Sequence, residues 1–353
     1  GDMSDQSLFE GEAKQIINEA ILKFTQANTR NEKKAARKLL SNGSDTRLSK
    51  YIKNNKDKLD TKQLVRFVLD DDVDSYFRGF IKKDTPEKQR RLNDIQIKYL
   101  DKMKNEGLIS YGVSDYLFFG SASRNAEMAG IKGAAIGSAL TLFVCFIIAF
   151  PIGVATAVYL EEFAPKNKFT ELIEININNL AAVPSVVFGI LGLAIFIKLF
   201  GMPRSIPLVG GLVLALMTLP TIIISSRAAI KAVPPSIRDG ALGIGASKMQ
   251  TTMHHVVPLA IPGMLTGTII GMAQALGETA PLLMIGMVAF IVDIPGGVTD
   301  PGTVLPVQIF MWADFAERMF VQKTSAAIIV LLIFLMLMNG GAVWLRRKLE
   351  RRW

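Results

Sequence analysis

The sequence contains almost no cysteine or histidine and lacks the common nucleotide-binding and catalytic motifs. Cys145 is the one cysteine among 353 residues, so no disulfide can form within the chain. The two histidines, His254 and His255, are adjacent and are expected on a helix surface rather than in a metal or catalytic site. No G-x-x-x-x-G-K-S/T, H-E-x-x-H or G-x-S-x-G motif occurs. These absences exclude ATP hydrolysis through a P-loop, so we expect no cofactor in this chain and no enzymatic activity.

The composition changes sharply near residue 130. Residues 1–125 are rich in Lys, Asp and Asn, whereas residues 130–353 are mostly apolar, so the overall hydrophobic fraction of 50% averages two unlike parts. The net charge of +9 is shared between solvated helices and the loops that flank apolar runs, and we therefore expect no nucleic-acid partner. The sequence predicts two domains, an α-rich one over residues 1–125 and a membrane one over residues 126–353.

The first domain alternates polar helical patterns with breaks. Apolar residues recur at helical spacing, as at Ile17, Ile21 and Phe24. The predicted helices are Glu12–Gln26, Asn31–Leu40, Thr61–Leu69 and Pro86–Glu106. Lysine-rich faces would suit nucleic acid, but no recognition motif accompanies them and a solvated surface is the favoured interpretation. The sequence does not indicate what this domain does.

Five apolar runs follow, each near or above the roughly 20 residues that cross a bilayer as a helix. They cover residues 131–159, 177–200, 207–228, 259–291 and 324–345. Two pairs of glycines, Gly133 with Gly137 and Gly267 with Gly271, have the spacing that lets helices approach closely. The sequence therefore predicts an all-α membrane protein with five transmembrane helices.

Basic residues in the short loops orient these spans. The loop 226–258 and the tail Arg346–Arg352 are basic and are separated by two spans, so the positive-inside rule places both in the cytoplasm. Counting back, residues 1–125 lie outside the cell membrane. A hydrophilic domain on that side requires a span before it, so a further transmembrane helix upstream of Gly1 is expected. The predicted location is a bacterial inner (plasma) membrane, with lipid around the spans and a cytoplasmic C-terminus.

The loop 226–258 is long for a simple connection and is predicted to form two short helices with a turn at Gly243 and Gly245. It resembles the EAA loop of ABC-transporter permeases, Glu-Ala-Ala, three residues, Gly, nine residues, Ile-x-Leu-Pro. The matching positions are Asp239, Gly240, Ala241, Gly245 and Pro258. Aspartate and glycine replace the first Glu-Ala, while the spacing is intact. The resemblance implies docking of this loop into a cytoplasmic ATPase; the alternative is an ordinary surface helix-turn-helix.

A second motif lies in the fourth apolar run. A carboxylate at the bilayer centre costs roughly 2.5–3.5 kcal/mol on insertion scales, so Glu278 should face a partner or a wet cavity. The segment Gln274–Pro281 resembles the Gly-Glu-Thr motif of phosphate-specific permeases, and with the loop it makes residues 125–353 similar to the PstA-type subunits. That family often has Arg-Ala where this chain has Gln274-Ala275, so an expected cation is missing. The resemblance assigns Gln274, Glu278 and Thr279 to the translocation path.

This resemblance implies the ABC importer permease fold with six spans, the first being the one expected upstream. It also implies a homologous PstC-type permease, a dimer of ATPase subunits that bind ATP, and an extracytoplasmic phosphate-binding protein as partners. The expected function is ATP-driven import of inorganic phosphate. Alternatives are a permease for another oxyanion (molybdate, sulfate or phosphonate), a non-transport membrane scaffold, and an intramembrane enzyme, which is disfavoured because Glu278 lacks a catalytic companion.

Overall fold

The computed structural model describes residues 3–41, 43–54, 66–110, 112, 115–315 and 317–349. Throughout these ranges the secondary structure is helical, and an isolated bridge between Leu40 and Leu69 is the one β-type pairing found there. The chain divides into two compact units, residues 1–130 with 315–323, and residues 131–314 with 324–353. The predicted all-α class is confirmed.

The first unit is built from short helices with polar caps. They are α1 (Met3–Thr25), α2 (Arg30–Arg37), α3 (Ser44–Asn54), α4 (Asp71–Phe77), η2 (Glu87–Gln89), α5 (Asp94–Asn105), α6 (Asp115–Phe119) and η3 (Ala126–Met128). Reciprocal capping boxes, Thr29 with Glu32 and Asn93 with Gln96, begin α2 and α5 because each satisfies two backbone donors of a first helical turn. The core of the unit includes the fully buried Leu39 and Leu100.

Two of the helices predicted in this unit differ from the structure. The predicted helix Pro86–Glu106 is wrong in its first third: η2 is a single 3-10 turn, and α5 begins only after the cap at Asn93. Of the predicted helix Thr61–Leu69, residues 61–65 lie outside the described residues, and the rest is irregular because Leu69 pairs with Leu40. The two other predicted helices are confirmed as α1 and α2. The boundaries of α2 agree to within a few residues, whereas α1 begins earlier than expected.

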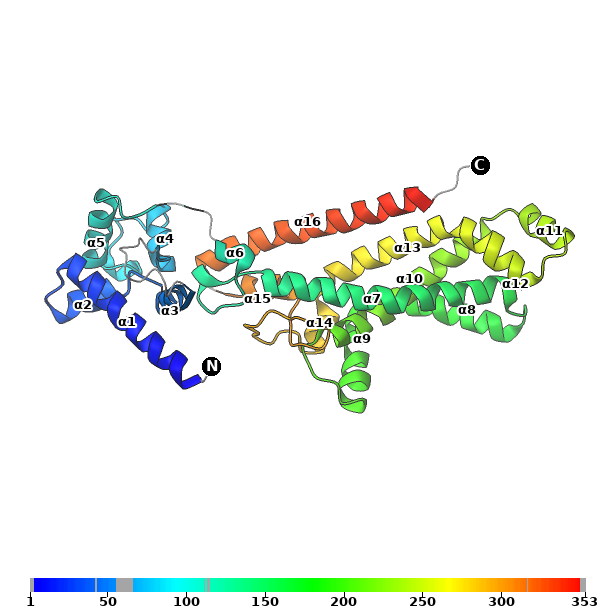
Figure 1. Ribbon diagram of the computed structural model, residues 1–353, viewed down its shortest axis with the longest axis horizontal. Coiled ribbons are helices and arrows are strands. Elements are labelled where there is room, and N and C mark those ends of the chain that lie inside the picture. Colours follow the sequence, from blue (N-terminus) through cyan, green and yellow to red (C-terminus); the bar gives the residue numbers. More distant parts are fainter. Residues whose placement is uncertain are drawn as a thin grey trace. The chain divides into compact units, whose positions relative to one another are not determined.

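The second unit contains the long apolar helices, including α16 from Thr324 onward (Figure 1). In chain order they are α7 (Lys132–Val158), the π-helical η4 (Tyr159–Phe163), α8 (Lys168–Ala181), α9 (Ser185–Gly192), the π-helical η5 (Leu193–Leu199), α10 (Pro207–Lys231), α11 (Pro235–Gly243), α12 (Lys248–Thr251), the π-helical η6 (Thr252–Val256), α13 (Val257–Gly277), α14 (Ala280–Met284), α15 (Leu305–Ala313) and α16 (Arg318–Leu349). Helix α10 lies between α7 and α13 and packs on both. Their facing side chains form the main core, in which Cys145 is buried as a free thiol.

Among the described residues, four helices are long and apolar enough to cross a membrane. These are Lys132–Phe163, Pro207–Lys231, Lys248–Gly277 and Arg318–Lys348. A fifth candidate is the pair Lys168–Ala181 and Ser185–Leu199, which bends by 102° at its break. Only 6% of the apolar window of α16 is buried, against 61% for α10. Most of α16 in this unit therefore presents apolar side chains to lipid or to another chain.

Two predicted spans are not continuous helices. The run 177–200 contains the end of α8, a sharp bend, and then α9 and η5, so the predicted fifth span is present only as a bent pair of helices. The run 259–291 is helical only to Gly277; the short α14 follows, and residues 285–291 are turns and irregular chain. Glu278 is consequently the C-cap of α13, and the expectation that it sits in the middle of a continuous span is also wrong. Helix α15 was not predicted.

The predicted glycine pairs contribute one close contact each. A Cβ on Gly137 would lie 2.0 Å from the carbonyl oxygen of Thr303, and one on Gly267 would lie 1.7 Å from Oγ of Ser225. Larger residues at these two positions would separate the packed segments. A Cβ on Gly133 or Gly271 would have only contacts near 3.8 Å, so this other member of each pair is not required for close packing.

Candidate functional site

Of the two short helices predicted in the loop 226–258, α11 is a separate helix after α10, whereas α12 continues through η6 into α13, so the prediction of a second separate short helix is wrong. Helix α11 ends at Gly243, and α12 begins after Ser247, whose hydroxyl accepts a hydrogen bond from the N–H of Gln250 in a capping box. The turn between them depends on Gly245, which has φ +92°, a conformation that residues with a Cβ rarely adopt. Gly243 belongs to α11, so the prediction of a turn at both glycines holds only for Gly245.

This loop is shorter than expected. Helix α10 continues to Lys231, and an unbroken helical stretch runs from Lys248 to Gly277. Residues 232–247, which include α11, therefore form the whole connection, and the outer parts of the predicted loop 226–258 belong to the two long helices. Pro258 lies within this helical stretch, just after the junction of η6 and α13, and is half-buried.

The loop residues predicted to couple to an ATPase do not all face outward. Asp239, Gly240 and Gly245 are exposed, whereas Ala241 is buried. The structure adds large apolar side chains that project from the tip of the loop: Leu242, Ile244, Met249 and Met253. Ile244 is 83% exposed, which is unusual for so apolar a side chain at a helix end. The sequence interpretation missed these residues, although apolar residues flanking the Gly243 and Gly245 turn are a readable signal.

The inner side of the loop is packed on the bundle. Ile237 of α11 and Val233 contact an apolar cluster that includes Val158 of α7, Ile230 of α10 and Val256 of η6. These contacts join α11 to α7, α10 and η6. The loop therefore combines a fixed inner face with an exposed, partly apolar outer face.

The adjacent histidines lie on the π-helical segment that joins the loop to α13. His254 and His255 are both exposed. Among the described residues, no group of three or more His, Cys, Asp or Glu side chains is placed to hold a metal ion. The expected position of the histidines on a helix surface agrees with the structure.

The three residues predicted for the translocation path lie together at the end of α13. Gln274 is exposed, and Glu278 and Thr279 are partly exposed at the break between α13 and α14. Over the part of the chain that the structure describes, Glu278 forms no ion pair and its side chain no hydrogen bond. Its carboxylate thus remains available to a charged group from outside this chain.

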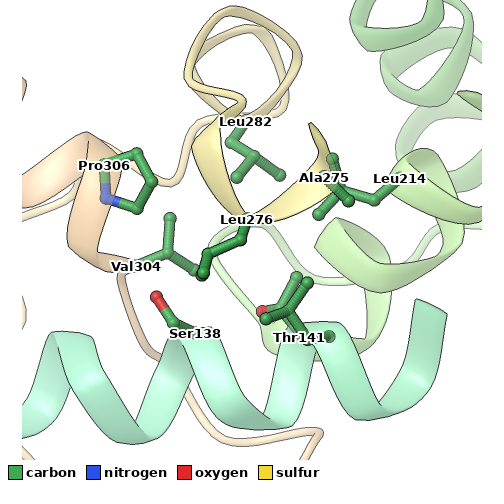
Figure 2. Close-up of a pocket in the computed structure, with 9 residues that line it drawn as sticks. Ser138, Thr141, Leu214, Ala275, Leu276, Leu282, Val304 and Pro306 are labelled. Atoms are coloured by element: carbon green, nitrogen blue, oxygen red, sulfur yellow. The ribbon is translucent and has the colours of Figure 1, made fainter. Parts of the chain in front are cut away.

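The neighbouring residues Ala275 and Leu276 point the other way, into a small cavity (Figure 2). Its remaining walls come from α7, α10, α14 and the start of α15: Ser138, Thr141, Leu142, Leu214, Leu282, Val304 and Pro306. Ser138 Oγ accepts a hydrogen bond from the N–H of Leu305 at 2.8 Å, while the buried Thr141 Oγ1 has no partner among the described residues. The cavity is narrow, with room for about one water molecule.

A comparison with known protein families agrees with this architecture. Residues 149–353, more than half of the chain, match the family described as "Binding-protein-dependent transport system inner membrane component". This chain belongs to that family. It is accordingly a multi-pass membrane component of a transport system and not an enzyme. Residues 1–87 match a separate family described as "Domain of unknown function (DUF3333)".

Curated relatives of this permease carry ABC-transporter and phosphate-transport names. The "Probable ABC transporter permease protein YqgI" of Bacillus subtilis is 34% identical over 184 residues, which cover 50% of this chain and 62% of the relative. PstC of Haemophilus influenzae, a "Phosphate transport system permease protein", is 30% identical. The alignment covers 56% of this chain and 69% of the relative. PstA of Yersinia pestis, of the same description, is 28% identical, with 64% of this chain and 75% of the relative aligned.

The chain spans only 62% of the length of each of the first two relatives that it matches. Relatives named PstA and PstC match at comparable identity, so identity alone does not separate these two subunit types. Among solved structures, an inward-facing form of the MetNI methionine ABC transporter aligns with a TM-score of 0.50 and 18% identity. The alignment covers 63% of this permease and 96% of that chain, and it supports the predicted ABC importer permease fold.

Proposed function

We propose that this chain is a permease subunit of an ATP-driven importer of inorganic phosphate. The observation that carries the proposal is the loop between α10 and α13, which presents an exposed apolar tip on a rigidly packed base in a member of a transport-component family. In an ATP-driven importer, a membrane subunit without a P-loop receives the work of ATP hydrolysis from a partner. The exposed tip is suited to fit a cleft on such a partner.

The coupling contact in this proposal involves both predicted and newly found residues. Asp239 and Gly240 lie on the exposed side of α11, and Ile244 projects beyond its C-terminus. Gly245 sets the direction of the chain into α12. Burying Ile244 in an ATPase cleft would remove a large apolar side chain from water, a gain of about 1.5–3 kcal/mol for a fully buried residue of this size. Two ATPase subunits would serve the two permeases of the complex.

Phosphate is the proposed substrate because relatives named as phosphate transport permeases match the membrane unit, and because the residues at the end of α13 suit an anion path. Gln274 and Thr279 offer neutral hydrogen-bond donors. Glu278 alone would repel phosphate, so in this proposal a cation from the homologous second permease pairs with it. The unpaired state of Glu278 over the described residues is consistent with that arrangement.

The proposal also assigns sides of the membrane. The basic loop and the C-terminal end of α16 would be cytoplasmic, and residues 1–125 would be extracytoplasmic, on the side from which a phosphate-binding protein delivers its ligand. The apolar faces left open on α7 and α16 would then contact lipid and the second permease. Residues 126–353 would form the permease domain.

Reconstitution tests this function. The chain, its homologous permease, the ATPase and the phosphate-binding protein are incorporated into vesicles, and uptake of radiolabelled phosphate is measured with unlabelled molybdate, sulfate or a phosphonate as competitor. We expect uptake that excess unlabelled phosphate abolishes and the other three anions leave unchanged. Suppression by another oxyanion at lower concentration than phosphate would identify that anion as the substrate and contradict the proposal.

A further inference from the structure

An acidic segment at the end of α7 contacts each of the basic residues around the coupling loop. The π-helical η4 has the sequence YLEEF and includes Glu161, Glu162 and Phe163. Single π-helical turns within α-helices frequently occur at functional sites, because the extra residue redirects the side chains that follow. Here three consecutive residues reach three different elements: α10, α11 and α12.

The contact with α11 is the most extensive. One oxygen of Glu162 accepts hydrogen bonds from Nη2 and Nε of Arg238 at 2.8 and 3.1 Å. The same guanidinium donates to the carbonyl oxygens of Val233 at 2.7 Å and Ile230 at 2.9 Å. Arg238 therefore ties three segments together: its own helix α11, the end of α10 and the end of α7. The Glu162 side chain is only 10% exposed, so the pair is largely shielded from solvent.

A second contact joins η4 to α10. Arg227 donates from Nε to Glu161, and its Nη2 lies 2.7 Å from a carboxylate oxygen of Glu174 on α8. The side chains of Arg227 and Glu161 are both 11% exposed. Lys231 lies 3.4 Å from the same oxygen of Glu161 but is mostly in solvent, so it contributes little.

The third contact involves α12. Nζ of Lys248 lies 5.5 Å from the centre of the Phe163 ring, within the range of a cation–π interaction. All four basic residues that mark this region in the sequence, Arg227, Lys231, Arg238 and Lys248, thus contact η4. Arg227 and Arg238 are largely shielded in these contacts, whereas Lys231 and Lys248 remain exposed.

Shielded ion pairs contribute little net stability compared with apolar side chains, because desolvation offsets their attraction, but they hold a geometry firmly once formed. The ion pairs of Glu161 and Glu162 connect the loop to the end of α7. In the sequence, α7 is distant from α11. Helix α7 runs from η4 back to Thr141 at the small cavity beside the end of α13, a distance of about 30 Å at 1.5 Å per residue. One continuous helix, which contains Pro151, therefore links the loop to the region of the path residues.

We propose that Glu161 and Glu162 form a clamp, here called the acidic clamp, that positions the coupling loop on α7 and transmits displacement of α11 to that helix. This inference rests on the proposed function. The loop is the contact with the ATPase, and the acidic clamp is the connection through which ATP-driven movement of the loop reaches the membrane helices. Arg238 and Glu162 are positioning residues and touch neither nucleotide nor substrate.

The first test is a double-mutant cycle in the reconstituted complex, with phosphate uptake and ATP hydrolysis measured in the same vesicles. Glu162→Gln and Arg238→Gln should each lower phosphate transported per ATP hydrolysed about tenfold, within the range typical of coupling between sites. The double variant should lose no more than Arg238→Gln alone, because Arg238→Gln already removes the contact with Glu162 together with the bonds to Val233 and Ile230. Arg238→Lys, which keeps the charge, should retain part of the coupling. Glu171→Gln, an exposed residue of α8 with no ion pair in the described chain, is the matched control and should behave as the unmodified protein.

Three outcomes of this cycle would overturn the inference. Native coupling in Glu162→Gln would show that the clamp transmits nothing. Additive losses in the double variant would show that the two residues act separately. Failure of the ATPase to co-purify with Glu162→Gln would show that the clamp only holds the loop in shape for docking. In each case phosphate uptake by the unmodified complex would leave the proposed function standing.

A second test does not depend on the identity of the substrate. Spin labels are attached to cysteines at Lys132, at the far end of α7, and Ser236, on α11; both positions are exposed, and the buried Cys145 is protected from the label. We expect one narrow distance distribution that ATP leaves unchanged, and a broadened or ATP-dependent distribution in the Glu162→Gln background. An ATP-dependent change of equal size in both backgrounds would contradict the clamp, whichever anion the complex carries.

Discussion

Valine in place of Gly245 would act on the turn between α11 and α12 through the backbone alone. A Cβ built on Gly245 meets no atom within 4 Å, so no steric clash accompanies the substitution. The backbone, however, has φ +92°, a conformation that costs a residue with a side chain about 1–3 kcal/mol and is least tolerated by β-branched residues. Valine therefore imposes this cost locally and leaves the packed faces of the helices untouched.

The strain would be relieved by opening the turn. Two backbone hydrogen bonds close it, from the N–H of Gly245 to the carbonyl of Leu242 at 3.0 Å and from the N–H of Ala246 to the carbonyl of Ala241 at 3.1 Å. Each contributes about 1 kcal/mol net, so together they are of the same size as the strain. We expect Gly245→Val to populate an open turn in which Ile244 no longer projects in its native direction, while membrane insertion is unaffected.

The assay compares ATP hydrolysis with phosphate uptake in reconstituted vesicles. Gly245→Val should lower uptake per ATP hydrolysed by about tenfold, the factor that corresponds to 1.4 kcal/mol. Gly245→Asn should have a smaller effect, because asparagine tolerates a positive φ better than other residues with side chains. Gly243→Ala is the matched control: Gly243 lies in α11 without a positive φ, has open space around its Cβ, and should show native coupling.

A native rate of phosphate uptake by well-expressed Gly245→Val, with native ATP consumption, would refute this reasoning. The same holds for equal losses in Gly243→Ala and Gly245→Val, because such a result would point to a general sensitivity of the loop rather than to its backbone conformation.

Three further predictions address orientation, the anion path and the first unit. A thiol reagent that cannot cross the membrane should label a cysteine at Lys53 from outside intact cells and not one at Lys248; the reverse pattern would invert the proposed topology. Glu278→Ala should impair transport or assembly, because stranding a buried partner charge costs about 3–5 kcal/mol of stability. Glu278→Asp should retain some function. Normal phosphate import by an assembled Glu278→Ala complex would show that Glu278 has no such role. Burial raises the pKa of Asp70 from 3.8 to about 6, so the folded unit binds this proton more tightly than the unfolded chain does. The free energy of unfolding should therefore fall as the pH rises from about 4 through 6. The expected loss is about 1 kcal/mol after allowance for solvent screening. Asp70→Asn keeps the cap on α4 and should abolish this loss, as read from pH-corrected hydrogen exchange of α4; an unchanged pH dependence would show that another group is responsible.

Features set by local sequence could be predicted. The turn at Gly245 and the start of α12 follow from a glycine and the Ser247 cap within a few residues of each other, and the long apolar helices follow from composition. In the first unit, Pro86 was a misleading start signal because the capping box of Asn93 and Gln96 fixes the beginning of α5. The stronger of two local signals therefore decided the boundary.

Features set by contacts between distant residues could not be predicted. The run 259–291 is apolar throughout, so hydropathy does not reveal that the chain leaves the helix at Glu278 and packs α14 against α9. Arg238 is 76 residues from Glu162, and no local pattern connects them. The same basic residues that indicate orientation by their charge are also long-range ion-pair partners, and only the fold shows this.

The central claim, that this permease serves active phosphate import, is tested most directly by accumulation against a gradient. Vesicles that contain the reconstituted complex and internal ATP are given radiolabelled phosphate with its binding protein, and the internal concentration is followed over time. The account predicts that internal phosphate rises above the external concentration and that accumulation stops when ATP is omitted. Phosphate that only equilibrates across the membrane, or that enters equally well without ATP, would contradict it.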